Sequence, residues 1–298
     1  MKTLLFIYNP AAGKAKITNA LGEVTALFQK EDWLVTLYAT KAAGDATKAV
    51  QELGSSYDRI ICSGGDGTLS EVVTGLIHGG LKQPLGYLPA GSTNDFSKTL
   101  RLPANLCKAA AIAAAGEPFA CDMGQFNDSH IFVYVAAFGL FTNVAYETPQ
   151  EIKQILGHAA YVLKGIQSLT DITSYSMTIQ HDGIVEEGNF IYGMVSNSVS
   201  VGGFQGMKNH DVILDDGKFE VLLVETPTSL AQLNTIIAAL LARTPNEKVR
   251  SFQTSSISFH CNTPVAWTLD GEYGGNHEDS YVEILPQAVQ MIRGRDTV

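Results

Sequence analysis

The chain has few of the features that mark a secreted, membrane-spanning or metal-stabilised protein. Over 298 residues it has four cysteines, two tryptophans and no apolar run near the ~20 residues that span a bilayer. Cys62, Cys107, Cys121 and Cys261 lack metal-ligand spacing and lie mostly in apolar stretches, which is typical of buried, reduced thiols. The apolar start, residues 1–7, is too short for a signal peptide. We therefore expect a cytoplasmic protein.

Positive charge is also scarce. Lys and Arg together number 20 against 30 Asp and Glu, which gives a formal net charge of -10. A nucleic-acid binder needs a basic face to displace counterions, so this balance argues against a nucleic-acid partner. It also weakens general attraction to anionic membranes, where each surface Lys or Arg contributes ~1 kcal/mol. Any membrane contact would have to be local.

A Walker-type Gly-x-x-x-x-Gly-Lys-Ser/Thr segment is absent, but another glycine loop, GGDGT, occupies residues 64–68. A short apolar strand precedes it, and apolar residues at helical spacing follow it. Thr68 and Glu71 have the spacing of a capping box, so we expect the helix to begin at the end of the loop. Such a junction offers backbone N–H groups to phosphate, and Asp66 could hold Mg²⁺ carried on a nucleotide. A tight turn with a solvated Asp explains the same loop about equally well.

Strand and helix patterns alternate from the start to about residue 120, which predicts βαβ units and a mostly parallel sheet with helices on both faces. In such a sheet the carboxyl ends of the strands meet at one edge. Four loops are expected to converge there, namely residues 9–13, Thr40, residues 64–68 and residues 89–96.

Beyond residue 120 the pattern changes to period-two alternation with Asp-Gly turns, which predicts an antiparallel, β-rich domain. Two apolar helical stripes, at residues 152–166 and 230–241, are inserted in it. We expect a nucleotide-binding α/β domain over residues 1–122 and a β-rich domain over residues 123–287. Residues 288–298 either continue the second domain or return to the first.

These motifs occur in an order that resembles the diacylglycerol kinase catalytic-domain family, in particular its soluble bacterial lipid kinases, with sphingosine and ceramide kinases more distant. The matching segments are residues 9–13 (NPAAG), Thr40 with residues 44–46, residues 64–68, 89–96 (PAGSTNDF), 156–157 with 160–161, 215–217 (DDG) and 269–272 (LDGE). The GGDGT loop alone is shared with NAD kinases and phosphofructokinases. Two departures are Ser92, where many relatives have Thr, and residues 208–211 (KNHD), which replace a proline-containing approach.

The resemblance implies a Rossmann-like nucleotide domain similar to that of NAD kinases and phosphofructokinases, followed by an antiparallel β-sandwich-like domain for a lipid substrate. It implies transfer of the γ-phosphoryl group of ATP to a lipid hydroxyl, with Mg²⁺. The nucleotide-binding residues that it implies are Asn9, Pro10, Ala11, Ala12, Gly13, Thr40, Gly64, Gly65, Asp66, Gly67, Thr68, Leu69, Ser70 and Ser92.

The resemblance also implies two metal sites. Asp66, Asp95 and Asp122 would form the catalytic Mg²⁺ network, some of them through water. Asp95 as a helix cap and Asp122 as a turn residue are equally good interpretations. A structural Mg²⁺ would take a side-chain oxygen of Asp216 and main-chain oxygens of Ile213 and Lys218. An ordinary hairpin turn explains that loop almost as well.

For the catalytic base the resemblance implies Glu272, with Asp270 beside it as a metal ligand or competing base. Two nearby carboxylates would raise each other's proton affinity, which favours a base near neutrality. The residues alone favour an Asp-Gly hairpin with solvated acids. The resemblance reverses that preference.

Rival hypotheses are an NAD kinase and a nucleotide-binding regulator without catalysis. For the lipid kinase, the partner is a lipid substrate at a membrane surface, reached peripherally and transiently. The helix expected over residues 149–169 either borders the lipid opening or packs within the second domain. The identity of the lipid, and whether the protein is a monomer or a homodimer, stay open.

Overall fold

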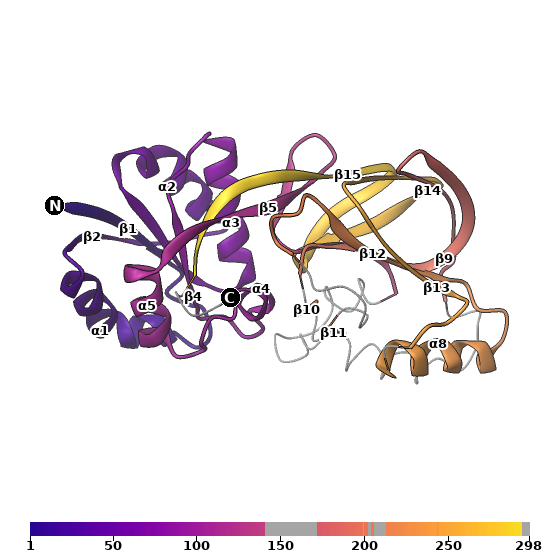
Figure 1. The fold of residues 1–298 in the computed structure, drawn as a ribbon, viewed down its shortest axis with the longest axis horizontal. Coiled ribbons are helices and arrows are strands. Elements are labelled where there is room, and N and C mark those ends of the chain that lie inside the picture. The colour runs from indigo at the N-terminus through magenta and orange to yellow at the C-terminus, as the bar shows by residue number, and fades with distance from the viewer. Residues whose placement is uncertain (141–171, 199, 202–203, 206–212, 243, 294–298) are drawn as a thin grey trace. The chain divides into compact units, whose positions relative to one another are not determined.

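The computed structural model describes residues 1–140, 172–198, 200–201, 204–205, 213–242 and 244–293 (Figure 1). The chain divides into two compact units. The first comprises Met1–Met123 and Pro286–Val298, and the second comprises Gly124–Leu285. The carboxyl-terminal segment therefore returns to the first unit, an alternative that the sequence left open.

The first unit is built on a parallel sheet. Its strands are β1 (Lys2–Tyr8), β2 (Trp33–Ala39), β3 (Arg59–Gly64) and β4 (Leu85–Pro89), in the order β4-β3-β1-β2. All three neighbouring pairs are parallel, and Ser63 stands between Tyr8 of β1 and Leu88 of β4. The carboxyl ends of β1, β3 and β4 are thereby brought level, as the alternating pattern predicts.

Helices cover both faces of this sheet (Figure 1). They are α1 (Lys16–Lys30), α2 (Asp45–Leu53), the short 3₁₀ helix η1 (Gly54–Ser56), α3 (Asp66–His78), α4 (Asp95–Thr99) and α5 (Leu106–Ala115). Phe6 of β1 and Ile61 of β3 share one apolar core with Phe28 of α1 and Ala110 of α5. The predicted doubly wound α/β fold is confirmed.

The expected capping box at the start of α3 is wrong. The helix begins at Asp66, and its N-cap, Gly65, has no side-chain hydrogen bond. The Glu71 carboxylate instead accepts hydrogen bonds from Gly44 N (2.8 Å) and Ala46 N (3.1 Å). It therefore satisfies backbone donors at the amino end of α2. A negative charge there also interacts favourably with the positive end of the helix dipole.

The second unit is built from antiparallel strand pairs. Its strands are β6 (His130–Phe132), β7 (Val135–Gly139), β8 (Tyr175–His181), β9 (Ile184–Ser196), β10 (Ser200–Val201), β11 (Phe204–Gln205), β12 (Phe219–Glu225), β13 (Val249–Thr254) and β14 (Ser256–Leu269). Two further strands, β5 (Glu117–Phe126) and β15 (Glu272–Arg293), belong to both units. β15 pairs antiparallel with β14 in the second unit, and through Met291 in parallel with β4 in the first.

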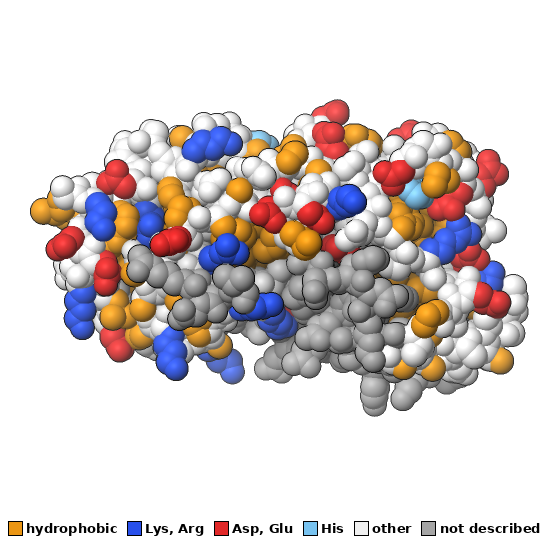
Figure 2. Space-filling model, viewed as in Figure 1, with side chains coloured by type: hydrophobic (Ala, Val, Ile, Leu, Met, Phe, Trp, Pro, Cys, Tyr) orange, Lys and Arg blue, Asp and Glu red, His pale blue; other side chains and the backbone are white. Residues whose placement is uncertain are grey.

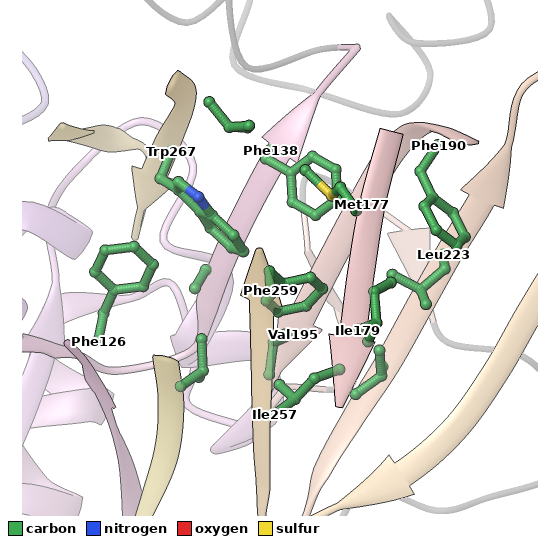
Figure 3. Close-up of a cluster of buried hydrophobic side chains, with 14 of the residues drawn as sticks. Phe126, Phe138, Met177, Ile179, Phe190, Val195, Leu223, Ile257, Phe259 and Trp267 are labelled. Atoms are coloured by element: carbon green, nitrogen blue, oxygen red, sulfur yellow. The ribbon is translucent and has the colours of Figure 1, made fainter. Parts of the chain in front are cut away.

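An aromatic cluster fills the core of the second unit. Figure 3 shows the Trp267 ring near Phe126, Phe138 and Phe259, with ring centroids 5.0, 5.0 and 5.2 Å away. In β14 the buried Ile257 and Phe259 alternate with more exposed residues, as the period-two pattern predicts, whereas all five residues of β7, Phe138 included, are buried.

The apolar stripe predicted at residues 230–241 is helix α8 (Leu230–Ala242), whereas the one predicted at residues 152–166 lies outside the described residues. None of the described helices is both long and apolar enough to cross a membrane. All four cysteines are described, and none forms a disulfide. On the face shown in Figure 2, acidic and basic side chains are interspersed.

Candidate active site

Three loops at the carboxyl edge of the parallel sheet are in backbone contact. Ala90 N and Gly91 N both donate to Gly64 O, at 2.8 and 3.1 Å. A Cβ added to Gly13 (φ 54°) would collide with the carbonyl of Ala90, and one added to Gly91 would lie 2.5 Å from Gly65 Cα. Residues 9–13, 64–68 and 89–96 therefore form a single, glycine-lined backbone surface, the convergence that the sequence predicts.

Asn94 holds the third of these loops in shape. It adopts a left-handed conformation (φ 49°), and its side-chain amide both accepts from Gly91 N (2.9 Å) and donates to Gly91 O (2.8 Å). The buried Tyr87 hydroxyl lies 3.3 Å from both Asn94 Oδ1 and Gly64 O. Burial, with smaller contributions from charges that include Asp66, raises the pKa of Tyr87 well above its usual value, so the hydroxyl keeps its proton.

The carboxylate of Asp66 faces the amino end of α4. It accepts from Asp95 N (3.2 Å) and Phe96 N (3.5 Å), so the first helical residue of α3 orders the neighbouring loop. Asp66 is therefore not the solvated turn residue of the alternative interpretation. Asn94, and not Asp95, occupies the N-cap of α4. The Asp95 side chain is buried and pairs with Lys98 Nζ at 2.8 Å.

The third predicted metal residue, Asp122, lies within strand β5 and not in a turn. It is fully buried, and its Oδ1 accepts from Gln287 N at 2.7 Å, which ties β5 to β15 within the first unit. Over the part of the chain that the structure describes, no three His, Cys, Asp or Glu side chains are grouped to hold a metal ion. The metal roles of Asp66, Asp95 and Asp122 stay predictions.

The other predicted nucleotide residues lie along the same edge. Thr40 N donates to Tyr8 O (2.9 Å), Asn9 Oδ1 accepts from Ala11 N (2.9 Å), and Ser92 is exposed on its loop. Ser63, which the sequence analysis did not select, is completely buried beneath them, and its Oγ has no hydrogen-bond partner. Tyr87 and Lys98 were also missed, and Asn94, which lies in the predicted loop of residues 89–96, had no role assigned to it. For Lys98 the sequence does contain a signal, because its i, i+3 spacing from Asp95 is that of an ion pair on a helix.

The two acids of residues 269–272 have different surroundings. Asp270 (φ 50°) and Gly271 (φ 86°) form a two-residue type I′ turn that joins β14 to β15, with Leu269 paired to Glu272. The predicted Asp-Gly hairpin is therefore present. Glu272 is exposed, but Asp270 is only 5% exposed, and its carboxylate accepts from Val133 N at 2.7 Å.

The predicted structural-metal loop is an exposed turn. Asp216 Oδ1 accepts from Lys218 N (3.0 Å), Gly217 has a φ of 72°, and Ile213 is 51% exposed. A side chain that accepts from the backbone two residues on is an Asx turn, the ordinary alternative to a metal loop. The unusual approach segment, residues 208–211, lies outside the described residues, as do the motif residues 156–157 and 160–161.

Comparison with known proteins gives matches to both halves of the chain. Residues 3–126 match the model of the diacylglycerol kinase catalytic domain, and residues 135–293 match that of the YegS C-terminal NAD kinase beta sandwich-like domain. A diacylglycerol kinase of Staphylococcus saprophyticus is 34% identical over 99% of this chain and 96% of its own. The chain belongs to the diacylglycerol kinase family. One from Staphylococcus carnosus is 33% identical with the same coverage.

Solved structures agree with the family assignment. A Bacillus anthracis str. Sterne structure superimposes with a TM-score of 0.86 at 25% identity, covering 100% of this chain and 97% of the other. The fold alone also matches the structure of a diacylglycerol kinase from the same organism, with a TM-score of 0.79 at 24% identity, covering 100% of this chain and 98% of the other. As a diacylglycerol kinase family member the chain is a lipid kinase, with an NAD kinase-like first domain and a β-sandwich-like second one. The family assignment favours this function over the rival NAD kinase.

Proposed function

We propose that this lipid kinase transfers the γ-phosphoryl group of ATP, with Mg²⁺, to the hydroxyl group of a diacylglycerol-like lipid. The observation that carries the proposal is the single backbone surface made by residues 9–13, 64–68 and 89–96 at the carboxyl edge of the sheet. Phosphoryl transfer asks a protein mainly to position the reactants and to stabilise negative charge, and such a surface suits the triphosphate.

The fit to phosphate rests on backbone geometry. A Cβ at Gly13 would meet the backbone of Ala90 and one at Gly91 would meet the backbone of Gly65, so these loops approach one another as only glycine allows. The amino end of α3 lies at Gly65 on the same surface, which adds the first N–H groups of the helix and the positive end of the helix dipole. The triphosphate would lie against these loops.

The fit to Mg²⁺ rests on the chemistry of the donor set. Asp95 N donates to the Asp66 carboxylate, so the two residues are neighbours, and both carry a carboxylate group, the ligand type that Mg²⁺ prefers. To bind the ion, Asp66 would exchange a hydrogen bond from Asp95 N or Phe96 N, and Asp95 would exchange its pairing with Lys98. We propose that they hold the ion, with Asp122 acting through water. The ion would supply charge neutralisation on the triphosphate. Ile213, Asp216 and Lys218 are proposed for a second, structural ion.

Glu272 is proposed as the general base. It is exposed at the start of β15, immediately after a tight turn, so a substrate hydroxyl can reach it. In the reaction the lipid oxygen forms a bond to the γ-phosphorus while the bond from that phosphorus to the bridging oxygen of ADP breaks. Glu272 would accept the proton that the hydroxyl loses, and ADP would leave as the second product.

We propose that the protein is cytoplasmic and binds its lipid substrate at a membrane surface, through a peripheral and transient contact. The physical argument is that each buried CH₂ contributes ~0.8 kcal/mol, so complete extraction of a two-chain lipid would need a long apolar tunnel. Entry of the head group and the first part of the chains alone avoids that requirement.

The experiment that tests the proposal incubates purified protein and Mg²⁺ with γ-labelled ATP and a panel of acceptors. The panel contains dispersed diacylglycerol, a long-chain base, ceramide, a total lipid extract and NAD. We expect label in the organic phase with diacylglycerol, and none when EDTA replaces Mg²⁺. Labelling of NAD alone, or nucleotide binding without transfer to any acceptor, would refute the proposal.

A further inference from the structure

The carboxylate of Asp270 faces backbone donors inside the second unit. Its Oδ2 accepts from Val133 N (2.7 Å), and its Oδ1 accepts from Tyr134 N (2.9 Å) and Val135 N (3.2 Å). The backbone adds a fourth bond, because Asp270 N donates to Val135 O at 2.9 Å. The segment of residues 133–135 is thus bound to the β14–β15 turn through one side chain and one peptide group.

These bonds leave the carboxylate badly placed to take part in chemistry. The residue is only 5% exposed, and three N–H groups direct their hydrogens at its two oxygens. A metal ion or a substrate hydroxyl would have to displace those donors, which would then be buried without partners. Glu272, two residues later, has no such restriction because it is exposed.

We propose that Asp270 is a positioning residue for Glu272 and neither a base nor a metal ligand. The inference rests on the proposed role of Glu272 as the base. Hydrogen bonds from backbone N–H groups to an ionised carboxylate are roughly twice as strong as neutral ones, so they hold the type I′ turn firmly. Glu272 is the first residue of β15 after that turn and is paired with Leu269, so its location follows that of Asp270.

Two substitutions loosen the turn by different amounts. Asp270→Asn keeps a side chain that tolerates the left-handed conformation and retains an oxygen for Tyr134 N and Val135 N, but it sets an NH₂ group against Val133 N. Asp270→Ala removes all three acceptor interactions. A displacement of about 1 Å costs on the order of 100-fold in rate, so we expect kcat to fall about 10-fold in the first variant and about 100-fold in the second.

The split between kinetic constants separates positioning from direct roles. Because the nucleotide is bound by the first unit, we expect KM for ATP and the affinity for ATP·Mg²⁺ to change less than about twofold in Asp270→Asn. Loss of ATP·Mg²⁺ affinity in that variant would overturn the inference in favour of a metal ligand. Asp270→Asn also serves if Asp270→Ala does not fold.

A double-mutant cycle tests whether Asp270 acts through Glu272. If it does, Asp270→Asn combined with Glu272→Gln has the same residual kcat as Glu272→Gln alone, since there is no base left to misplace. Losses that multiply would overturn the inference while leaving the proposed base intact. Wild-type turnover in Glu272→Gln would instead refute the base assignment itself, and the inference with it.

Thr254→Val controls for lost stability. Thr254 is buried in the same unit, and its hydroxyl donates to Ser256 O (2.8 Å), away from the turn. We expect this variant to lower Tm and to keep wild-type kcat at a temperature where it is folded. If Asp270→Asn does the same, with kcat unchanged, then Asp270 serves stability alone and the positioning role is wrong.

Discussion

Single substitutions at Asp66 and Glu272 should have different effects, because the two side chains have different proposed roles. The Glu272 side chain is exposed and contributes little to packing, whereas the Asp66 carboxylate accepts from Asp95 N and Phe96 N and so orders the loop of residues 89–96. Removing a base affects only the chemical step. Removing Asp66 affects the chemical step and the shape of the nucleotide surface.

We expect Glu272→Ala to lower kcat about 100- to 10,000-fold, the usual contribution of a general base, with ATP affinity and Tm unchanged. Asp66→Ala should lower kcat by a similar factor and also weaken ATP binding. Steady-state kinetics with diacylglycerol and calorimetric titration with ATP·Mg²⁺ measure both effects.

Asp66→Asn is the matched control for folding, because Asn keeps an oxygen that accepts from one of the two N–H groups. It should restore most of the Tm lost in Asp66→Ala but little of the activity. Near-normal turnover in Glu272→Ala and Asp66→Ala together would refute the assignment of both roles.

At the scale of the elements, the structure shows why local patterns predict some contacts and miss others. The alternation of strand and helix fixes the parallel sheet, and a parallel sheet necessarily brings its carboxyl-end loops to one edge. That is why the convergence of residues 9–13, 64–68 and 89–96 could be predicted. It needs no knowledge of individual side chains.

Contacts between distant elements could not be predicted in this way. Glu71 has the local spacing of a capping box, but its acceptor oxygens serve Gly44 N and Ala46 N of another helix. Asp270 and Gly271 have the local signature of a hairpin. The N–H groups that donate to the Asp270 carboxylate, however, lie more than 130 positions earlier, at residues 133–135. A local pattern holds no information about either partner.

The contact between two of the loops gives a prediction at this scale. A Cβ at Gly91 would lie 2.5 Å from Gly65 Cα and 2.8 Å from Asn94 Oδ1, so Gly91→Ala must push the loop of residues 89–96 away from the glycine loop. Overpacking of this kind usually costs about 1–3 kcal/mol of stability. We expect KM for ATP to rise on the order of tenfold, measured by initial rates at saturating lipid.

Gly22→Ala is the control. Gly22 lies in α1 of the same unit, with nothing within 4 Å of the added Cβ. Because alanine favours a helix interior over glycine by about 0.8–1 kcal/mol, this variant should raise Tm and leave KM for ATP unchanged. An unchanged KM in Gly91→Ala as well would mean that the nucleotide does not use this loop.

At the scale of the whole molecule, the residues proposed for nucleotide binding and those proposed for the base and its positioning lie in different compact units. The residues proposed for nucleotide binding, from Asn9 to Ser92, all belong to the first unit, and Asp270 and Glu272 belong to the second. The chain passes between the units within β5 and within β15, since each of these strands has residues in both.

This division predicts how nucleotide binding changes stability. A ligand that binds only the folded state stabilises it by RT ln(1 + [L]/Kd), about 2.7 kcal/mol at a concentration 100 times Kd.

We expect ATP·Mg²⁺ to slow amide hydrogen exchange in residues 9–13, 64–68 and 89–96 and in α3, while exchange in the described strands β8, β9, β12 and β13 stays unchanged. Hydrogen exchange read by mass spectrometry, with Asp66→Ala as the control that loses the effect, measures this. Slowing confined to the second unit would contradict the location proposed for the nucleotide, because protection follows the surface that the ligand covers.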